Sequence, residues 1–207
     1  KSTIQSFTFN QYTYSNVNID GALHRKLFTG SVEIADNNLQ LRFKGLVDLN
    51  YETPKYSFTA DLFRLNLKPL NLFQSDKIKD DLIISGSTNL NLLGKDIDDI
   101  AGNALFYNLK IQNGKRIFAL DTISLYSDIT DFKRTLRLKS SIVTADVNGK
   151  YTFKELPNAF INLLHNYFPY RFKYTKPTSE QNVDFWVNIN NPALFSQILL
   201  PELQTLQ

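Results

Sequence analysis

The amino-acid sequence predicts a mainly β protein whose strands form one long sheet with a continuous apolar face. A short pattern recurs along the chain, a glycine followed by apolar residues at every second position, as in Gly30-Ser31-Val32-Glu33-Ile34 and Gly45-Leu46-Val47-Asp48-Leu49. Successive side chains of a strand point to opposite faces of a sheet, so each occurrence has one apolar face and one polar face. Hydrophobic residues make up 43% of the 207 residues, which is enough for a sizeable core, and 21% are charged.

Alternating apolar residues continue this pattern along most of the chain. The polar stretch 35–38 predicts a hairpin turn. The apolar positions change parity between Phe106 and Leu109, which predicts a β-bulge near Tyr107-Asn108. The pair Asn148-Gly149 predicts a tight turn, because both residues readily adopt positive φ. We expect a loop over residues 74–81 and strands over residues 7–19, 30–34, 39–49, 56–72, 84–92, 102–111, 116–120, 123–126, 136–145, 151–153 and 183–189.

Two segments near the end of the chain have helical spacing instead. Residues 157–168 carry apolar side chains on one helical face, with a proline in the first turn and Pro169 as the stop. Asn191-Pro192 is a favourable helix start for a second short helix that ends before Pro201. We therefore divide the chain into a repeated-strand region, residues 1–153, and a helix-strand-helix extension of the same sheet, residues 154–207.

Composition excludes several functional classes. The 23 basic and 20 acidic residues give a net charge of +3, which is too balanced for a dedicated nucleic-acid binder. Cysteine is absent, which excludes disulfides, thiolate metal sites and a cysteine nucleophile. No stretch approaches the ~20 apolar residues that span a bilayer. Methionine is also absent, even at position 1, and we therefore expect an internal segment or a processed product.

Candidate catalytic and metal-binding residues are few. His24 and His165 have no neighbouring ligand at metal spacing, and we interpret both as structural. The pairs Asp80-Asp81 and Asp98-Asp99 lack the spacing of a calcium loop, and we interpret them as turn and cap residues. Ser85-Gly86-Ser87 lacks the flanking glycines of a nucleophile elbow. The sequence thus predicts a protein that is not an enzyme and uses no cofactor or metal.

Basic residues gather in two places. We interpret them as the solvated face of strands, with contact to anionic lipid headgroups or nucleic acid as the alternative. The first group is Lys133, Arg134, Arg137 and Lys139, and the second is Arg171, Lys173 and Lys176, which alternate with aromatic residues.

The apolar face itself has two interpretations. It could be the closed core of a sandwich or barrel, or one side of an elongated sheet whose interior stays partly open. Few helices are available to cover it, and Asn, Ser and Thr recur among its residues. At ~0.8 kcal/mol per buried CH₂, one fourteen-carbon acyl tail would gain on the order of 10 kcal/mol before entropic costs. An open apolar trough therefore needs no specific headgroup contact to hold lipid.

Four segments in residues 61–151 resemble the TamB family of AsmA-like envelope proteins, particularly its Bacteroidetes members. They are Asp61-Leu62-Phe63-Arg64-Leu65-Asn66-Leu67, Gly94-Lys95-Asp96-Ile97-Asp98-Asp99-Ile100-Ala101-Gly102, Asp121-Thr122-Ile123-Ser124-Leu125, and Leu136-Arg137-Leu138-Lys139-Ser140 leading to Ala145-Asp146-Val147-Asn148-Gly149-Lys150-Tyr151. The resemblance implies an elongated, curved, antiparallel-type sheet folded into a half-pipe with a hydrophobic groove. It also implies a periplasmic segment of a protein that is anchored in the inner membrane and reaches toward the outer membrane.

The resemblance implies phospholipid transport between the two membranes, and no catalytic residue is carried over with it. The expected partners are phospholipid acyl chains, with an outer-membrane assembly protein or a nascent outer-membrane protein as further candidates. The alternative function is an interaction module whose strand edges pair with an outer-membrane protein strand during its assembly. We expect the groove to be lined by Val32, Ile34, Leu39, Leu41, Phe43, Val47, Leu49, Phe58, Leu62, Leu90 and Leu92.

Overall fold

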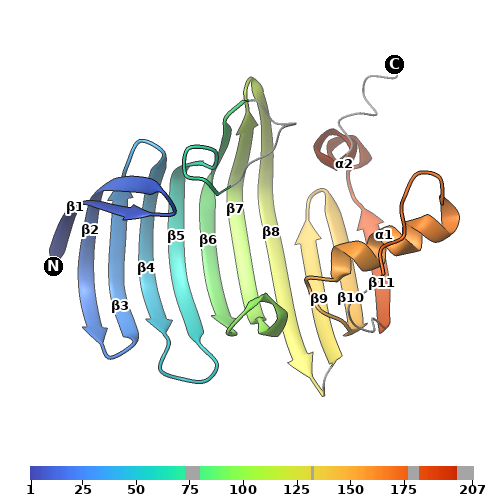
Figure 1. Ribbon diagram of the computed structural model, residues 1–207, viewed down its shortest axis with the longest axis horizontal. Coiled ribbons are helices and arrows are strands. Elements are labelled where there is room, and N and C mark those ends of the chain that lie inside the picture. Colours follow the sequence, from blue (N-terminus) through green and yellow to red (C-terminus); the bar gives the residue numbers. More distant parts are fainter. Residues whose placement is uncertain (73–79, 132, 177–181, 200–207) are drawn as a thin grey trace.

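The chain forms one 11-stranded antiparallel sheet in which the spatial order of the strands is their order in the sequence (Figure 1). The computed structural model describes residues 1–72, 80–131, 133–176 and 182–199. The sheet is not closed into a barrel, because its two edge strands, the first and the last, pair with one neighbour each. The prediction of a mainly β fold with an elongated, open antiparallel sheet and two short C-terminal helices is confirmed.

The described elements, in chain order, are β1 (Ser2–Phe9), β2 (Tyr12–His24), β3 (Leu27–Ala35), β4 (Leu39–Asp48), β5 (Lys55–Asn66), β6 (Leu82–Leu93), the short 3-10 turn η1 (Ile97–Asp99), β7 (Ala101–Asn113), β8 (Arg116–Thr130), β9 (Lys133–Ser140), β10 (Val143–Lys150), α1 (Leu156–Tyr167), β11 (Asn182–Ile189) and α2 (Pro192–Leu199).

Cross-strand register places the alternating apolar side chains on a single face. Val32 of β3 lies opposite Phe43 of β4, which lies opposite Ala60 of β5. The same face continues to the far edge, where Val147 of β10 lies opposite Phe185 of β11. We call this the apolar face. Charged and amide side chains occupy the other side, which we call the polar face.

The recurring glycines mark places where neighbouring strands approach closely. Gly30 of β3 lies between Gly21 of β2 and Gly45 of β4. A Cβ atom added to Gly30 would lie 2.4 Å from the Gly21 Cα, and one added to Gly45 would lie 2.4 Å from the Phe58 Cβ. Such contacts are shorter than any Cβ tolerates, so glycine is required where the backbones come this close.

At the β1 end, the sheet curls over its apolar face. The turn between β1 and β2 reaches the segment that follows β5, because the Asn10 side-chain amide donates to the carbonyls of Leu70 and Asn71, at 3.3 and 3.1 Å. The Asn71 amide donates back to the Asn10 carbonyl at 3.1 Å. In a flat sheet β2 and β5 would be about 14 Å apart, three spacings of about 4.8 Å. The apolar face is therefore the concave side here, and Leu70 is fully buried beneath the contact.

Two other segments cover the apolar face farther along (Figure 1). The turn η1 lies over the ends of β6, β7 and β8, and α1 lies over the last strands. The Phe160 ring of α1 meets the Phe185 ring of β11 edge to face, with centroids 6.4 Å apart. Between these covers, no other part of the described ranges forms a second layer on the apolar face.

The scarcity of fully buried side chains reflects this single-layer architecture. The accessible surface is 14471 Å² for a 23.8-kDa chain, whereas a globular monomer of this mass exposes about 9,900 Å². Most apolar side chains are half-buried instead. The buried hydrophobic residues among those described are Tyr14, Val17, Ala60, Leu70, Ala104, Ile142, Val147 and Tyr151.

Several local predictions are confirmed. The bulge exists, since Asn108 has φ 54° and the register of β7 against β6 slips by one residue next to it. The turn at residues 35–38 separates β3 from β4 as expected. Both helices form, although Pro201 lies outside the described residues, as do residues 74–79 of the predicted loop.

Other local predictions are wrong. Asn148-Gly149 lies within β10 rather than in a turn, because both residues pair with β9 and β11. Residues 116–130 form the single strand β8 instead of two strands, whereas residues 7–19 and 136–145 are each divided between two strands instead of one. The strand predicted through residue 72 ends at Asn66, and residues 151–153 are not in a strand. In the last two cases, apolar alternation continues beyond the end of the strand, after Asn66 and after Lys150.

A buried carboxylate organises the β1 end. Asp36 is 4% exposed and accepts hydrogen bonds from the Tyr12 hydroxyl at 2.6 Å, the Asn38 N–H at 2.9 Å and the Ser15 hydroxyl at 2.8 Å. Burial alone raises the pKa of Asp36, but the hydrogen bonds from Tyr12, Asn38 and Ser15 outweigh it and hold the pKa below its usual value. The ionised form therefore stabilises the fold.

Replacing this carboxylate should give a pH-dependent loss of stability. We expect Asp36→Asn to lower the free energy of unfolding by about 1–3 kcal/mol at neutral pH, because buried donors lose their acceptor. A depressed native pKa contributes stability above the unfolded-state value of about 3.9 and loses it as the pH falls through the native value. The difference between wild type and variant should therefore shrink below about pH 4, measured by urea unfolding across a pH series. The exposed Asp121→Asn variant is the control, and a pH-independent difference would contradict this role.

Candidate functional site

The predicted groove residues lie together on the apolar face. Ten of the eleven are half-buried and belong to β3, β4, β5 and β6. Leu49 is the exception, because it lies beyond the end of β4 and is 44% exposed. Direct cross-strand pairs connect the ten residues to one another and to their neighbours: Val32–Phe43–Ala60, Ile34–Leu41–Leu62, Leu39–Leu65, Val47–Tyr56–Leu92 and Phe58–Leu90.

A row of aromatic rings crosses the uncovered part of this face. Phe28, Phe43 and Phe58 come from three consecutive strands, and successive ring centroids are 6.2 and 4.7 Å apart. All three rings are half-buried. Each therefore packs on its neighbours from the side and leaves part of its surface available to a further apolar group.

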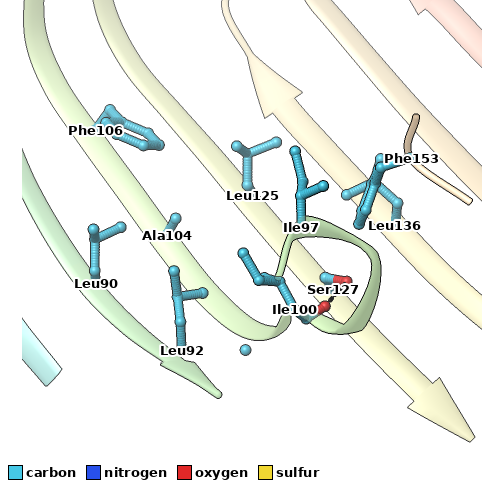
Figure 2. A pocket seen from close by; sticks show the side chains of 11 residues that line it. Leu90, Leu92, Ile97, Ile100, Ala104, Phe106, Leu125, Ser127, Leu136 and Phe153 are labelled. Carbon is cyan, nitrogen blue, oxygen red and sulfur yellow. Dashed lines mark hydrogen bonds between the residues drawn. The ribbon is translucent and has the colours of Figure 1, made fainter. Parts of the chain in front are cut away.

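Beyond this row, the apolar face deepens into a cavity of about 360 Å³ under η1 (Figure 2). Its floor is formed by residues of β6 to β9, and Ile97 and Ile100 lie over part of it (Figure 2). The Ser127 hydroxyl donates to the Ile100 carbonyl at 2.8 Å, so it is already engaged. The cavity is lined by Leu90, Leu92, Ile97, Ile100, Gly102, Ala104, Phe106, Leu125, Ser127, Leu136 and Phe153.

The lining residues predicted from the sequence include the β6 side of this cavity and none of its other sides. Leu90 and Leu92 were predicted as lining residues, and the structure places both in the floor. The side chains of β7, β8 and β9 have the same alternation, which could have extended the prediction. Ile97 and Ile100 were harder to find, because their segment has the composition of a polar turn.

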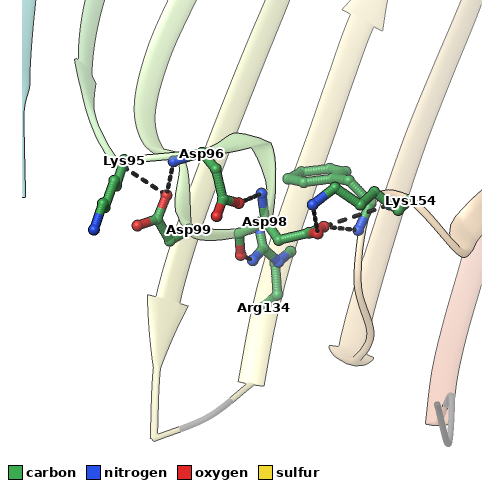
Figure 3. A network of polar contacts seen from close by, with 7 residues as sticks. Lys95, Asp96, Asp98, Asp99, Arg134 and Lys154 are labelled. Atoms are coloured by element: carbon green, nitrogen blue, oxygen red, sulfur yellow. Dashed lines mark hydrogen bonds and ion pairs between the residues drawn. The ribbon is translucent and has the colours of Figure 1, made fainter. Parts of the chain in front are cut away.

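Acidic residues hold η1 in place (Figure 3). The Asp99 carboxylate accepts the Lys95 and Asp96 N–H groups, both at 2.7 Å, and Asp96 caps the turn by accepting the Asp98 N–H at 2.7 Å. The interpretation of Asp98-Asp99 as turn and cap residues is thus confirmed. Sequence reasoning did not anticipate their position over the cavity.

Asp98 also ties η1 to the segment that follows β10. Its carboxylate accepts the Phe153 N–H at 2.7 Å and lies 3.1 Å from the Lys154 Nζ. Burial alone raises the pKa of Asp98, but the hydrogen bonds from Lys154 and Phe153 outweigh it and lower the pKa below its usual value. The cover of the cavity is therefore fastened by a charge-assisted contact between residues that are 55 apart in the sequence.

The predicted basic patch is divided between the two faces. Lys133, Arg137 and Lys139 are exposed on the polar face, as the solvated-face interpretation requires. Arg137 pairs with Asp146 at 3.1 Å, an exposed contact worth about 0–1 kcal/mol. The prediction is wrong for Arg134, because strand alternation turns this side chain onto the apolar face, where it is 6% exposed.

Arg134 lies beneath two aromatic rings beside the cavity. Its guanidinium carbon is 4.4 Å from the Phe153 ring centroid and 5.7 Å from that of Tyr151, and its Nη2 donates to the Asp98 carbonyl. Its Nε and Nη1 are buried and have no hydrogen-bond partner within the described ranges. Burial raises the pKa of Tyr151 to about 12, although Arg134 acts in the opposite direction.

The histidines take no part in this site. His24 is exposed at the end of β2, and the His165 Nδ1 of α1 lies 2.6 Å from the Phe172 carbonyl. Over residues 1–72, 80–131, 133–176 and 182–199, no group of three or more metal-ligating side chains comes together. In the same ranges, neither helix has the length and apolar character needed to cross a bilayer.

Comparison with protein-family models, with curated protein sequences and with solved structures gave no match. The chemistry of the site therefore rests on its own geometry. That geometry is a concave apolar surface with a partly covered cavity at one side and the buried guanidinium of Arg134 next to it.

Loosening the tie at Asp98 should release the cover of the cavity. We expect Asp98→Ala to accelerate amide hydrogen exchange of η1 and residues 153–154 by about tenfold to a hundredfold, the equivalent of losing hydrogen bonds to a charged group. Exchange in β3 and β4 should stay unchanged. The control is Asp128→Ala on β8, and unaltered exchange over η1 in Asp98→Ala would show that the carboxylate does not hold the cover.

Proposed function

We propose that this chain is a non-enzymatic segment whose apolar face forms a groove for the acyl chains of phospholipids. The observation that carries the proposal is the incomplete cover of that face. The Asn10–Asn71 contact, η1 and α1 each cover part of it, whereas the aromatic row of Phe28, Phe43 and Phe58 stays half-buried. A monomeric fold that used these residues only as a core would bury them.

Magnitudes support an acyl chain as the occupant. The cavity of about 360 Å³ falls in the range of about 300–1,000 Å³ that is typical of small-molecule sites. Each CH₂ group that leaves water for the groove contributes about 0.8 kcal/mol. Ten or more such groups would exceed the cost of immobilising a single chain, which is of the order of several kcal/mol.

We further propose that the parent protein is a TamB-like, AsmA-like member of the cell envelope. In this proposal the segment lies in the periplasm of an inner-membrane-anchored protein and contributes to phospholipid transport toward the outer membrane. The support is the succession of four sequence segments that resemble this family, together with an elongated, curved sheet of the kind that the resemblance implies. Observing an N-terminal membrane-spanning helix and further copies of the strand pattern in the complete reading frame would test it.

A charge placed on the apolar face should remove lipid binding. We expect Phe43→Glu to weaken binding of a fluorescent long-chain phospholipid analogue at least about tenfold, because the carboxylate would have to be buried against the acyl chain. Lys44→Glu is the matched control, since Lys44 is the next residue of the same strand and is exposed on the polar face. Binding is measured by fluorescence titration, with circular dichroism to establish that both variants fold.

A second apolar-face variant separates charge from occupied space. Ala104→Trp keeps the surface apolar but fills the cavity, so it should reduce acyl-chain binding without introducing a charge. Unchanged binding in both Phe43→Glu and Ala104→Trp would refute the groove.

One observation favours a second function. Strand β1 is a sheet edge that is exposed along its whole length, so its outward N–H and C=O groups are available to another strand. An outer-membrane protein strand under assembly could add to this edge by β-augmentation. Photocrosslinks from β1 to such a protein, with none from the apolar face to lipid, would favour this function over the groove.

A further inference from the structure

The buried guanidinium of Arg134 is the feature of the apolar face that acyl-chain binding does not explain. A charged side chain on an apolar surface is normally paired, because burial removes its hydration. Arg134 is 6% exposed, yet no ion pair joins it to an acidic side chain in the part of the chain that the structure describes. The nearby Asp98 carboxylate is directed to Phe153 and Lys154 instead.

The donor capacity of Arg134 is mostly unused. Its Nη2 donates to the Asp98 carbonyl, a neutral acceptor, and its Nε and Nη1 donate to nothing in the described residues. The rings of Phe153 and Tyr151 provide a cation–π contact but accept no hydrogen bond of ordinary strength. The Nε and Nη atoms of a guanidinium form a planar fork that matches the two oxygens of a carboxylate or phosphate.

The position of this fork relates it to the cavity. Phe153 lines the cavity and also stacks on the guanidinium, so one residue contacts both. Leu136, two residues from Arg134 on the same face of β9, also lines the cavity, and Asp98 belongs to the cover. Phe153 lies outside any strand. Its backbone N–H donates to Asp98, and its ring meets the Tyr151 ring edge to face, with centroids 6.0 Å apart.

We infer that Arg134 binds the head group of an amphiphile. This ligand has one anionic head group, a phosphate or a carboxylate, and a tail that fills the cavity under η1. This inference rests on the proposed acyl-chain groove and gives its ligand a chemical class. The tail contacts apolar side chains only, so it supplies affinity without selecting a headgroup. The fork supplies the selection, because an anion would satisfy the two unused donors and neutralise the buried charge.

The test compares three probes on the full chain by isothermal titration calorimetry at neutral pH. Dodecyl phosphate carries tail and head, dodecanol carries the tail alone, and inorganic phosphate carries the head alone. We expect dodecyl phosphate to bind about tenfold to a hundredfold more tightly than dodecanol, and inorganic phosphate to show no binding at millimolar concentration. Dodecanoate in place of dodecyl phosphate shows whether carboxylate or phosphate is the preferred head.

Variants assign the preference to this residue. Arg134→Gln should erase the preference for dodecyl phosphate over dodecanol, whereas Arg134→Lys, which keeps the charge without the fork, should retain part of it. Arg137→Gln on the polar face of the same strand is the matched control. Dodecyl phosphate should raise the melting temperature of wild type and of Arg137→Gln, but should raise that of Arg134→Gln no more than dodecanol does.

The outcomes distinguish failure of the Arg134 subsite from failure of the proposed acyl-chain groove. Equal affinity of wild type for dodecyl phosphate and dodecanol would overturn the Arg134 subsite and leave the groove standing. A preference that persists in Arg134→Gln would do the same. Absence of binding for both amphiphiles would refute the groove and the subsite together.

A separate surface carries a second inference, independent of the groove. From Leu156 to Lys176 the chain contains no acidic residue, and it exposes the cations Arg171, Lys173 and Lys176. The same segment exposes a dense set of large apolar side chains around α1. They are Phe160, Ile161, Leu163, Tyr167, Phe168, Tyr170 and Tyr174.

We infer that this segment docks on the surface of an anionic lipid bilayer. Aromatic side chains interleaved with Arg and Lys are typical of elements that lie in the membrane interface, where rings enter the headgroup layer and cations meet lipid phosphates. Charge complementarity favours a bilayer with a negative surface. This inference concerns how the protein meets a membrane and does not depend on what occupies the groove.

Sedimentation with vesicles tests the docking. We expect the chain to pellet with vesicles that contain phosphatidylglycerol and to remain in solution with pure phosphatidylcholine. Tyr170→Asp, and separately the double variant Arg171→Gln/Lys173→Gln, should each weaken pelleting about tenfold. Trp186→Asp is the matched control, because Trp186 is an exposed aromatic on the polar face of β11. Phe43→Glu should still pellet, and equal pelleting by all variants would overturn the inference.

Discussion

An apolar face that the described residues cover only in part is the constraint on which the rest of this structure depends. Strand alternation directs aliphatic and aromatic side chains to one side of the sheet, and leaving them in water is unfavourable by about 25 cal/mol per Å². The chain covers this face in three places. It folds the β1–β2 turn, η1 and α1 over parts of that face, and each cover is fastened by a few polar contacts, such as Asn10 with Asn71 and Asp98 with Phe153. What these covers leave open is the surface available to a ligand.

The polar residues on the apolar side serve two different ends. Asp36 is surrounded by donors, which keep it ionised although it is buried, and it stabilises the curl at the β1 end. Arg134 is equally buried but has only one hydrogen-bond acceptor within the described residues. A satisfied buried charge specifies a fold, whereas an unsatisfied one has a cost that a bound counter-charge removes. This contrast distinguishes the structural polar site from the proposed binding site.

The sequence predicts this fold to the extent that the fold is local. Strands such as β3 and β4 follow from period-two alternation, and the change of parity near Asn108 correctly predicts the bulge. Alternation cannot tell how far a face remains uncovered, because Ile97 and Ile100 reach the cavity through a turn with a polar composition. Arg134 is grouped by sequence with its basic neighbours in a solvated patch, although it alternates in step with Leu136 and Leu138 and therefore lies on the apolar face. The first failure comes from tertiary contacts of η1 with distant strands, and the second from grouping residues by charge rather than by their alternation along the strand.

The strand order has a consequence for how this molecule comes apart. Every strand pairs only with its neighbours in the sequence, from β1 through β11. Such a sheet resembles a one-dimensional array, in which stability is largely a sum of nearest-neighbour terms, to which the longer-range contacts of Asn10 with Asn71 and of Asp98 with Phe153 add. Unfolding then proceeds inward from an edge, with β1 and β11 opening at the lowest free energy and the middle strands at the highest. Loss of an outer strand would shorten the array and leave the remaining strands folded.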